Sequence, residues 1–278
     1  HSIYLPVIVM NNPPAPTATL TPTRIPSPTA TATPSCWPHV ATTFLAWNKP
    51  HGIAVAPGRL YIANFSGDGL PGTVSVVDIA TGVSIVSPIS VGLSPNGAAY
   101  NPANGMVYVA NRDSNSVSVI SYASNTVVAT IPVGTAPNGV AVNAAANRIY
   151  VANYASNTVS VIDGANNTVI ATRGTGSEPS MIAVNPAADR IYVSNHGSGT
   201  VSVLRGSDSA VIQTITLPGS IDPYGISVNP ATNLVYVVTI ADGKLFTIDG
   251  ASGAVLGAAM PPGGGTLWQV AANPLTNH

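Results

Sequence analysis

The stretch RIYVAN at residues 148–153 recurs through the chain with small changes. Its relatives are RLYIAN at 59–64, MVYVAN at 106–111, RIYVSN at 190–195 and LVYVVT at 234–239. Successive tyrosines are separated by 47, 42, 42 and 44 residues, which indicates a repeat of about 42 residues. Around RIYVAN, runs of alternating β-branched and small or polar residues are separated by turns rich in Asn, Asp and Gly. This pattern predicts four short antiparallel strands in each repeat.

Four antiparallel strands in one repeat form one blade of a β-propeller. The intact repeats span 49–92, 93–134, 135–176, 177–219 and 220–264. A sixth begins in 265–278 and stops before its tyrosine strand. We therefore expect an all-β, six-bladed β-propeller over 36–278, with a composite sixth blade that N-terminal residues complete, because an open ring would leave strand edges unpaired. The run 40–47 is the expected outer strand of that blade.

The repeats resemble the YVTN β-propeller repeats of bacterial and archaeal surface and secreted proteins. The resemblance is carried by YVAN at 108–111 and 150–153, YVSN at 192–195, TVSVID at 158–163, and Pro-Asn-Gly at 95–97 and 137–139. It covers residues 49–278 and implies a propeller. It implies no particular function, because propellers serve as enzymes, binding modules and scaffolds.

The N-terminal region has a different composition. Residues 13–35 are nearly all Pro, Thr, Ala and Ser, which favours extended chain and cannot build a core, so we expect a linker. Within the preceding segment 1–12, residues 3–9 are apolar on both faces, as in a buried strand. It fits the missing tyrosine strand, either in its own molecule or in a neighbouring copy, and we favour the copy. The expected interface residues are Ile3, Tyr4, Leu5, Val7, Ile8 and Val9.

Charge is unusually scarce in this chain. Charged residues make up 7% and hydrophobic residues 45%, with a net charge of −1. Either neutral polar residues and attached sugars keep the surface soluble, or part of it is buried in an assembly. The absence of a basic run excludes nucleic acid as a partner, and no apolar run reaches the roughly 20 residues that span a bilayer.

The chain begins with His1 and not Met, as after removal of a signal peptide, although a boundary inside a longer protein gives the same start. We expect an extracellular or cell-surface location. Cys36 is the only cysteine, so no internal disulfide can form. It is either a half-buried apolar residue or the site of a bond to another molecule. The N-glycan acceptor pattern occurs at Asn64 and Asn166.

The sequence offers little for catalysis. It has one glutamate and nine scattered aspartates, no nucleophile or phosphate-binding motif, and no metal-ligand spacing among His39, His51 and His196. We therefore expect a protein that is not an enzyme and has no cofactor and no metal. Recurring charged residues are expected to have structural roles. They are the turn aspartates Asp78, Asp163 and Asp249, and Arg59, Arg148 and Arg190 before the tyrosine strands.

One set of residues could contact a ligand. The residue after the proline that opens each repeat is expected near the mouth of the central channel, where a small molecule or glycan would bind. These residues are His51, Asn96, Asn138, Ser180 and Tyr224, with Trp268 as the nearest equivalent in the sixth repeat. Two functions are thus open. The first is a structural subunit that polymerises head to tail by N-terminal strand addition, and the second is a monomeric adhesion or ligand-binding propeller on a Pro/Thr-rich stalk.

Overall fold

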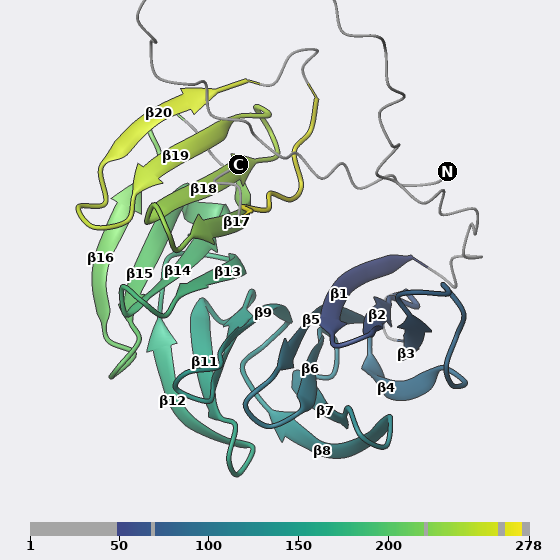
Figure 1. Ribbon diagram of the computed structural model, residues 1–278. Coiled ribbons are helices and arrows are strands. Elements are labelled where there is room, and N and C mark those ends of the chain that lie inside the picture. The colour runs from purple at the N-terminus through teal and green to yellow at the C-terminus, as the bar shows by residue number, and fades with distance from the viewer. Residues whose placement is uncertain (1–48, 68–69, 220–221, 261–264, 274–278) are drawn as a thin grey trace, which may run out of the picture.

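The computed structural model describes residues 49–67, 70–219, 222–260 and 265–273. They form five four-stranded antiparallel sheets, each with its strands in sequence order. Figure 1 shows the sheets arranged around a common centre, with the first strand of each sheet innermost. The innermost strands β1, β5, β9, β13 and β17 each contact the next in turn. The β-propeller fold expected from the repeats is therefore confirmed.

The first two sheets comprise β1 (Pro50–Ala56), β2 (Arg59–Asn64), β3 (Pro71–Asp78) and β4 (Ile89–Leu93), then β5 (Pro95–Asn101), β6 (Met106–Asn111), β7 (Ser116–Ser121) and β8 (Thr126–Pro132). The third and fourth comprise β9 (Pro137–Asn143), β10 (Arg148–Asn153), β11 (Thr158–Asp163) and β12 (Thr168–Gly174), then β13 (Pro179–Asn185), β14 (Arg190–Asn195), β15 (Thr200–Arg205) and β16 (Val211–Thr216). The fifth comprises β17 (Pro223–Asn229), β18 (Leu234–Thr239), β19 (Leu245–Asp249) and β20 (Val255–Ala259). A short 3₁₀ helix, η1 (His196–Ser198), follows β14.

Turn chemistry explains where the strands end. Asn125, Asn147 and Asn167 adopt left-handed φ angles of 54°, 48° and 57°, which short polar side chains tolerate better than most residues. The predicted turn role of the aspartates is also confirmed. Asp78 accepts a hydrogen bond from Thr81 N at 2.8 Å, and the equivalent bonds run from Ala165 N to Asp163 at 3.0 Å and from Ser252 N to Asp249 at 2.7 Å.

The hydrophobic core lies between adjacent sheets. For example, Tyr150 and Val161 of the third sheet pack against Ile191 and Val193 of the fourth. The innermost strands approach so closely that only glycine fits at some positions. A Cβ on Gly139 would lie 2.6 Å from the backbone oxygen of Ser180, far inside van der Waals contact.

The repeated tyrosines tie each sheet to the next. Their hydroxyl groups reach the turn between the third and fourth strands of the following sheet. The bonds run from Tyr61 to Asn125 Oδ1 (2.7 Å), Tyr108 to Asn167 Oδ1 (2.9 Å), Tyr150 to Gly206 O (3.4 Å) and Tyr192 to Gly250 O (3.0 Å). These tyrosines are fully buried, so the bonds connect sheets through the interior.

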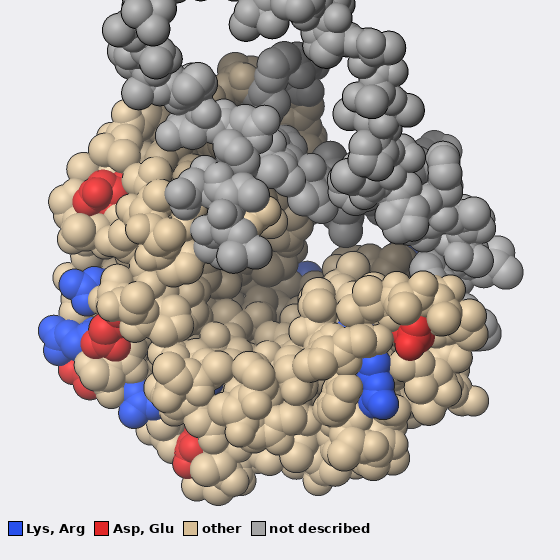
Figure 2. Space-filling view, viewed as in Figure 1, with Lys and Arg blue, Asp and Glu red and all other residues tan. Residues whose placement is uncertain are grey.

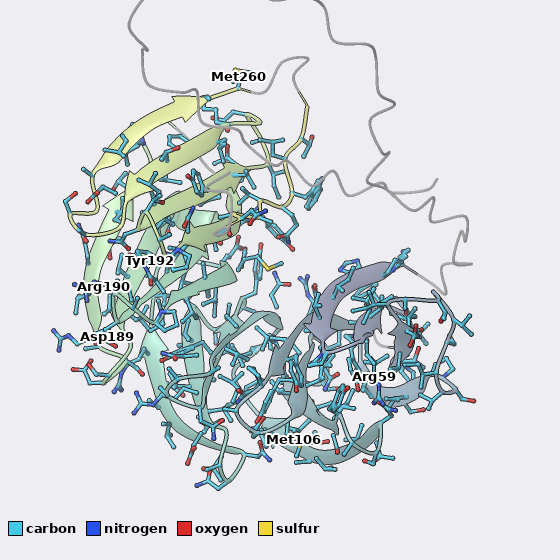
Figure 3. All side chains as sticks on the ribbon, in the orientation of Figure 1. Arg59, Met106, Asp189, Arg190, Tyr192 and Met260 are labelled. Carbon is cyan, nitrogen blue, oxygen red and sulfur yellow. The ribbon has the colours of Figure 1, made fainter. Side chains whose placement is uncertain are left out.

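The arginines before the tyrosine strands support the same turns. Arg59 donates to Tyr122 O at 2.7 Å, and Arg148 donates to Gly206 O at 2.7 Å. Among the described residues, Arg190 donates only to the adjacent Asp189 O, at 3.4 Å. Figure 3 shows Asp189 and Arg190 at the outer part of the ring, away from its centre. The expected structural role is confirmed for Arg59 and Arg148.

Among the described residues, no sheet lies between the fifth sheet and the first, and we call this side of the ring its open side (Figure 1). Sequence analysis predicted six blades, whereas the described residues form five complete sheets, so the six-bladed ring is not observed. The segment that follows the fifth sheet packs on that sheet. A Cβ on Gly225 would lie 2.7 Å from Trp268 O, so the backbone at Trp268 lies against β17 as β13 lies against β9. Leu267 packs on Val238 and Leu245. The other predicted elements, 1–12, 13–35 and 40–47, lie outside the described residues.

Candidate functional site

The predicted channel residues are brought together in two separate groups. His51 Nδ1 lies 3.4 Å from Asn96 Oδ1, and its ring stacks on Phe65 with centroids 4.8 Å apart. On the other side, Asn138 Nδ2 donates to the hydroxyl oxygen of Tyr224 at 3.4 Å. His51 and Asn96 meet because they lie on the neighbouring strands β1 and β5. Asn138 and Tyr224 form the second group and come from β9 of the third sheet and β17 of the fifth.

The remaining two predicted residues behave differently from each other. Ser180 is fully buried, and its hydroxyl donates to Glu178 O at 3.3 Å, so the side chain is already used within the protein. Trp268 has 43% of its surface exposed and meets Tyr224 edge to face, with ring centroids 5.5 Å apart and planes at 80°. Trp268 and Tyr224 therefore form one continuous aromatic surface.

A cluster that sequence analysis did not identify lies beside this surface. Glu178 Oε2 accepts a hydrogen bond from the Tyr154 hydroxyl at 2.8 Å and lies 3.1 Å from His196 Nδ1. His196 Nε2 is 3.9 Å from Asp222 Oδ1. The only glutamate of the chain thus joins a tyrosine and a histidine, and a second carboxylate lies on the far side of that histidine.

Hydrogen bonding and burial change the acidity of two of these groups. The bonds from Tyr154 and then from His196 hold the pKa of Glu178 below its usual value of 4.5. Burial, followed by the contact with Glu178, raises the pKa of Tyr154 to about 12. At neutral pH, Glu178 is therefore a carboxylate and Tyr154 keeps its proton.

Equivalent positions in successive sheets place this cluster. Glu178 and Asp222 each precede the proline that opens an inner strand, at left-handed φ angles of 54° and 64°. Tyr154 and His196 each follow the second strand of a sheet, and His196 N donates to Glu178 O at 2.9 Å. The signal was available in the sequence, because the residue after the repeated YVAN or YVSN differs in every repeat. Sequence analysis did not predict the cluster, because it weighed His196 only as a metal ligand.

The rings of this region follow one another from sheet to sheet. Arg112 lies over the ring of Tyr154 at 5.4 Å, and the centroid distances are 6.0 Å from Tyr154 to His196 and 6.2 Å from His196 to Tyr224. With Trp268, these residues form a chain that we call the aromatic arc. It runs from the end of β6 to the segment that follows the fifth sheet.

Other predicted sites have mixed outcomes. Asn64 is 5% exposed, and its amide donates to Thr73 Oγ1 and Ser75 Oγ, so the prediction of a glycan there conflicts with the packing. Asn166 is exposed and remains a predicted acceptor. The predicted interface residues Ile3, Tyr4, Leu5, Val7, Ile8 and Val9 lie outside the described residues.

Within the described ranges, no group of three or more His, Cys, Asp or Glu side chains is placed to hold a metal ion. No helix in the same ranges is long and apolar enough to cross a membrane.

Several solved propellers are similar to this chain. Virginiamycin B lyase from Staphylococcus aureus has 16% identity and a TM-score of 0.64, with 77% of this chain and 70% of the lyase covered. A functionally unknown protein from Desulfotomaculum acetoxidans has 17% identity and a TM-score of 0.64, with 78% and 74% covered. Hydrazine synthase from Kuenenia stuttgartiensis has 18% identity and a TM-score of 0.59, with 86% and 93% covered.

At these identities the similarity shows the fold alone. No protein-family model and no curated protein sequence matches the chain, so the resemblance to YVTN repeats is supported only as far as a β-propeller. The expectation that the chain is not an enzyme must be corrected. Two of the similar propellers bear the names of enzymes, so a propeller of this shape does not exclude catalysis.

Proposed function

We propose that the protein is an extracellular structural subunit that joins neighbouring copies by β-strand addition at the open side of its ring. The observation that carries the proposal is the exposure of apolar residues on the two sheets that border the opening. We call the faces of the first and fifth sheets on either side of it the open flanks.

The first open flank belongs to β1. Ile53 and Val55 are 51% and 66% exposed. Their counterparts on β9, Val140 and Val142, pack against Tyr108 and other core residues of the preceding sheet. A sheet placed before β1 would cover Ile53 and Val55 in the same way, and burial of each side chain would contribute roughly 1.5 kcal/mol or more.

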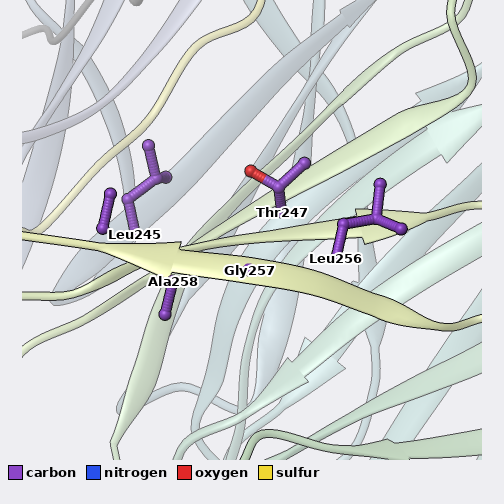
Figure 4. A pocket seen from close by; sticks show the side chains of 6 residues that line it. Leu245, Thr247, Leu256, Gly257 and Ala258 are labelled. Carbon is purple, nitrogen blue, oxygen red and sulfur yellow. The ribbon is translucent and has the colours of Figure 1, made fainter.

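The second open flank belongs to the fifth sheet. Leu256 and Met260 are about 60% exposed, and Figure 4 shows a largely apolar hollow on this sheet. The hollow is lined by Leu245, Thr247, Leu256, Gly257, Ala258 and Ala259. Tyr236 lies in β18, at the same position as the tyrosines whose hydroxyl groups bond to the following sheet. Among the described residues, no hydrogen-bond partner contacts the Tyr236 hydroxyl. Both flanks thus support an incomplete sixth blade of the repeat that resembles the YVTN type.

The occupant we propose is the segment Ile3–Val9 of a neighbouring copy. In sequence it is apolar at both odd and even positions, as a strand between two sheets requires. The linker 13–35 can extend by about 3.1 Å per residue, enough to span tens of ångströms. The surface also contains little charge to oppose contact between copies, and Figure 2 shows charged side chains thinly scattered over the face in view.

The proposal is tested by measuring the mass of the full chain in solution with size-exclusion chromatography and light scattering. We expect assemblies for the wild type and monomers after deletion of residues 1–12. A synthetic peptide of residues 1–12 should bind the truncated ring one to one without linking rings. Val55→Asp should prevent this binding. Val128→Asp is the matched control, because Val128 is also exposed but lies on the outer strand β8.

Two results would contradict the proposal. A monomeric wild type whose stability falls on deletion of residues 1–12 would mean that the segment closes its own ring. Assemblies that survive the deletion would mean that another surface joins the copies.

A further inference from the structure

We propose that the aromatic arc, together with Glu178, Asp222 and Asn138, binds a neutral sugar residue of a glycan. The inference does not depend on how the ring is completed. It rests on side chains next to the strands of the described sheets and on Trp268, which lies in the segment after the fifth sheet.

The first argument is the concentration of functional groups. Only 7% of the chain is charged, and the turn aspartates and two of the repeated arginines have structural roles. Glu178, His196 and Asp222 are nevertheless gathered at one end of the ring, with side chains between 25% and 43% exposed. Half-open charged groups anchored by hydrogen bonds are typical of binding sites.

The second argument is a buried polar group without a complete set of partners. Asn138 is 1% exposed, and its Oδ1 has no hydrogen-bond partner among the residues that the structure describes. Within the described ranges, the Asn138 side chain makes one hydrogen bond, to the hydroxyl of Tyr224, so one polar end lacks a partner there whichever way the amide is oriented. An unpaired buried polar group is costly, and a ligand hydroxyl beside Tyr224 would satisfy it.

The third argument concerns the class of ligand. Two carboxylates disfavour an anion. A sugar hydroxyl can both donate and accept, so it suits the carboxylate of Glu178 and the amide of Asn138 alike. The apolar C–H face of a sugar ring packs on an aromatic face, and Trp268 offers a partly exposed indole. Arg112 lies over Tyr154 and adds a positive charge to the arc, which favours a neutral ligand over a cation.

The test is a titration of the full chain by isothermal calorimetry. The probes are glucose, galactose, mannose, N-acetylglucosamine and their β-linked disaccharides, with choline as the cationic comparator. We expect saturable binding of at least one sugar. Glu178→Gln and Trp268→Ala should each weaken it by roughly tenfold or more, because each removes a direct contact.

Tyr154→Phe has a matched control in Tyr122→Phe. Both tyrosines lie under an arginine, but the hydroxyl of Tyr122 donates to Pro57 O, away from the arc. Tyr154→Phe should weaken sugar binding and Tyr122→Phe should not. The inference is overturned if no sugar binds, if only choline binds, or if Glu178→Gln and Trp268→Ala leave sugar binding unchanged. Light scattering on the same samples separates loss of binding from loss of assembly.

Discussion

Tyr192 donates its hydroxyl hydrogen to Gly250 O at 3.0 Å and so connects the fourth sheet to a turn of the fifth. Removing this hydroxyl leaves a buried carbonyl oxygen unpaired. We expect Tyr192→Phe to lower the free energy of unfolding by about 1–3 kcal/mol, measured by urea denaturation. Tyr236→Phe is the control and should change it much less, because no described residue pairs with the Tyr236 hydroxyl. Equal losses for both variants would contradict this role.

Arg148 and Arg190 occupy the same position in consecutive sheets but make different bonds. Arg148 donates to the carbonyl oxygens of both Gly206 and Ser207 at 2.7 Å, whereas the one bond that Arg190 makes within the described part of the chain is a long bond to its neighbour Asp189. Arg148→Ala should therefore lower the free energy of unfolding by about 1–2 kcal/mol, and Arg190→Ala by a few tenths. Denaturant unfolding compares the two, and the reverse order would refute the assignment.

Gly225 holds the segment after the fifth sheet against β17. A Cβ here would lie 2.8 Å from Gln269 Cα as well as against Trp268 O, so Gly225→Ala should displace residues 267–270 from the sheet. We expect faster proteolysis of the C-terminal segment and a melting temperature lower by several degrees. Gly257→Ala is the control, because a Cβ there meets no atom within 4 Å. The prediction does not hold if Gly225→Ala leaves both quantities unchanged.

Glu178 should make stability depend on pH in the acid range. Its pKa is lower in the folded state than the usual 4.5, so its stabilising contribution is complete above pH 4.5 and is lost as the pH falls through the folded-state pKa. Between about pH 5 and about pH 3, wild type should therefore lose more stability than Glu178→Gln. Thermal melts across that range measure the difference, and parallel curves for the two proteins would exclude the effect.

The repeated strands could be predicted because their signal is local. Alternating side chains and turn residues occur within each repeat, and the tyrosines all lie in second strands, as at Tyr108 and Tyr150. The glycan acceptor pattern at Asn64 was misleading because three residues of sequence do not report whether the asparagine is buried. The same asparagine ends the strand β2, and its amide is consumed by bonds to β3.

The site was harder to predict because its residues come from different sheets. Tyr154 and Glu178 are 24 residues apart, and His196 is 18 residues from Glu178, so no short motif contains them. Glu178 precedes the inner strand β13 of the fourth sheet, and Tyr154 follows β10, the second strand of the third sheet. Only the arrangement of the sheets in the ring brings these two positions together. The six predicted channel residues shared one repeat position, yet Ser180 is buried and His51 lies in a separate group from Tyr224.

The bonds from the repeated tyrosines all point the same way along the chain, from each sheet to the one that follows. Each of these bonds therefore joins only two adjacent sheets, and the bonding rule contains no information about the total number of sheets. Gain or loss of a whole repeat by gene duplication or deletion would still place a turn of the following sheet beside the tyrosine of the sheet before it. The size of such a ring can thus change during evolution without redesign of its individual sheets.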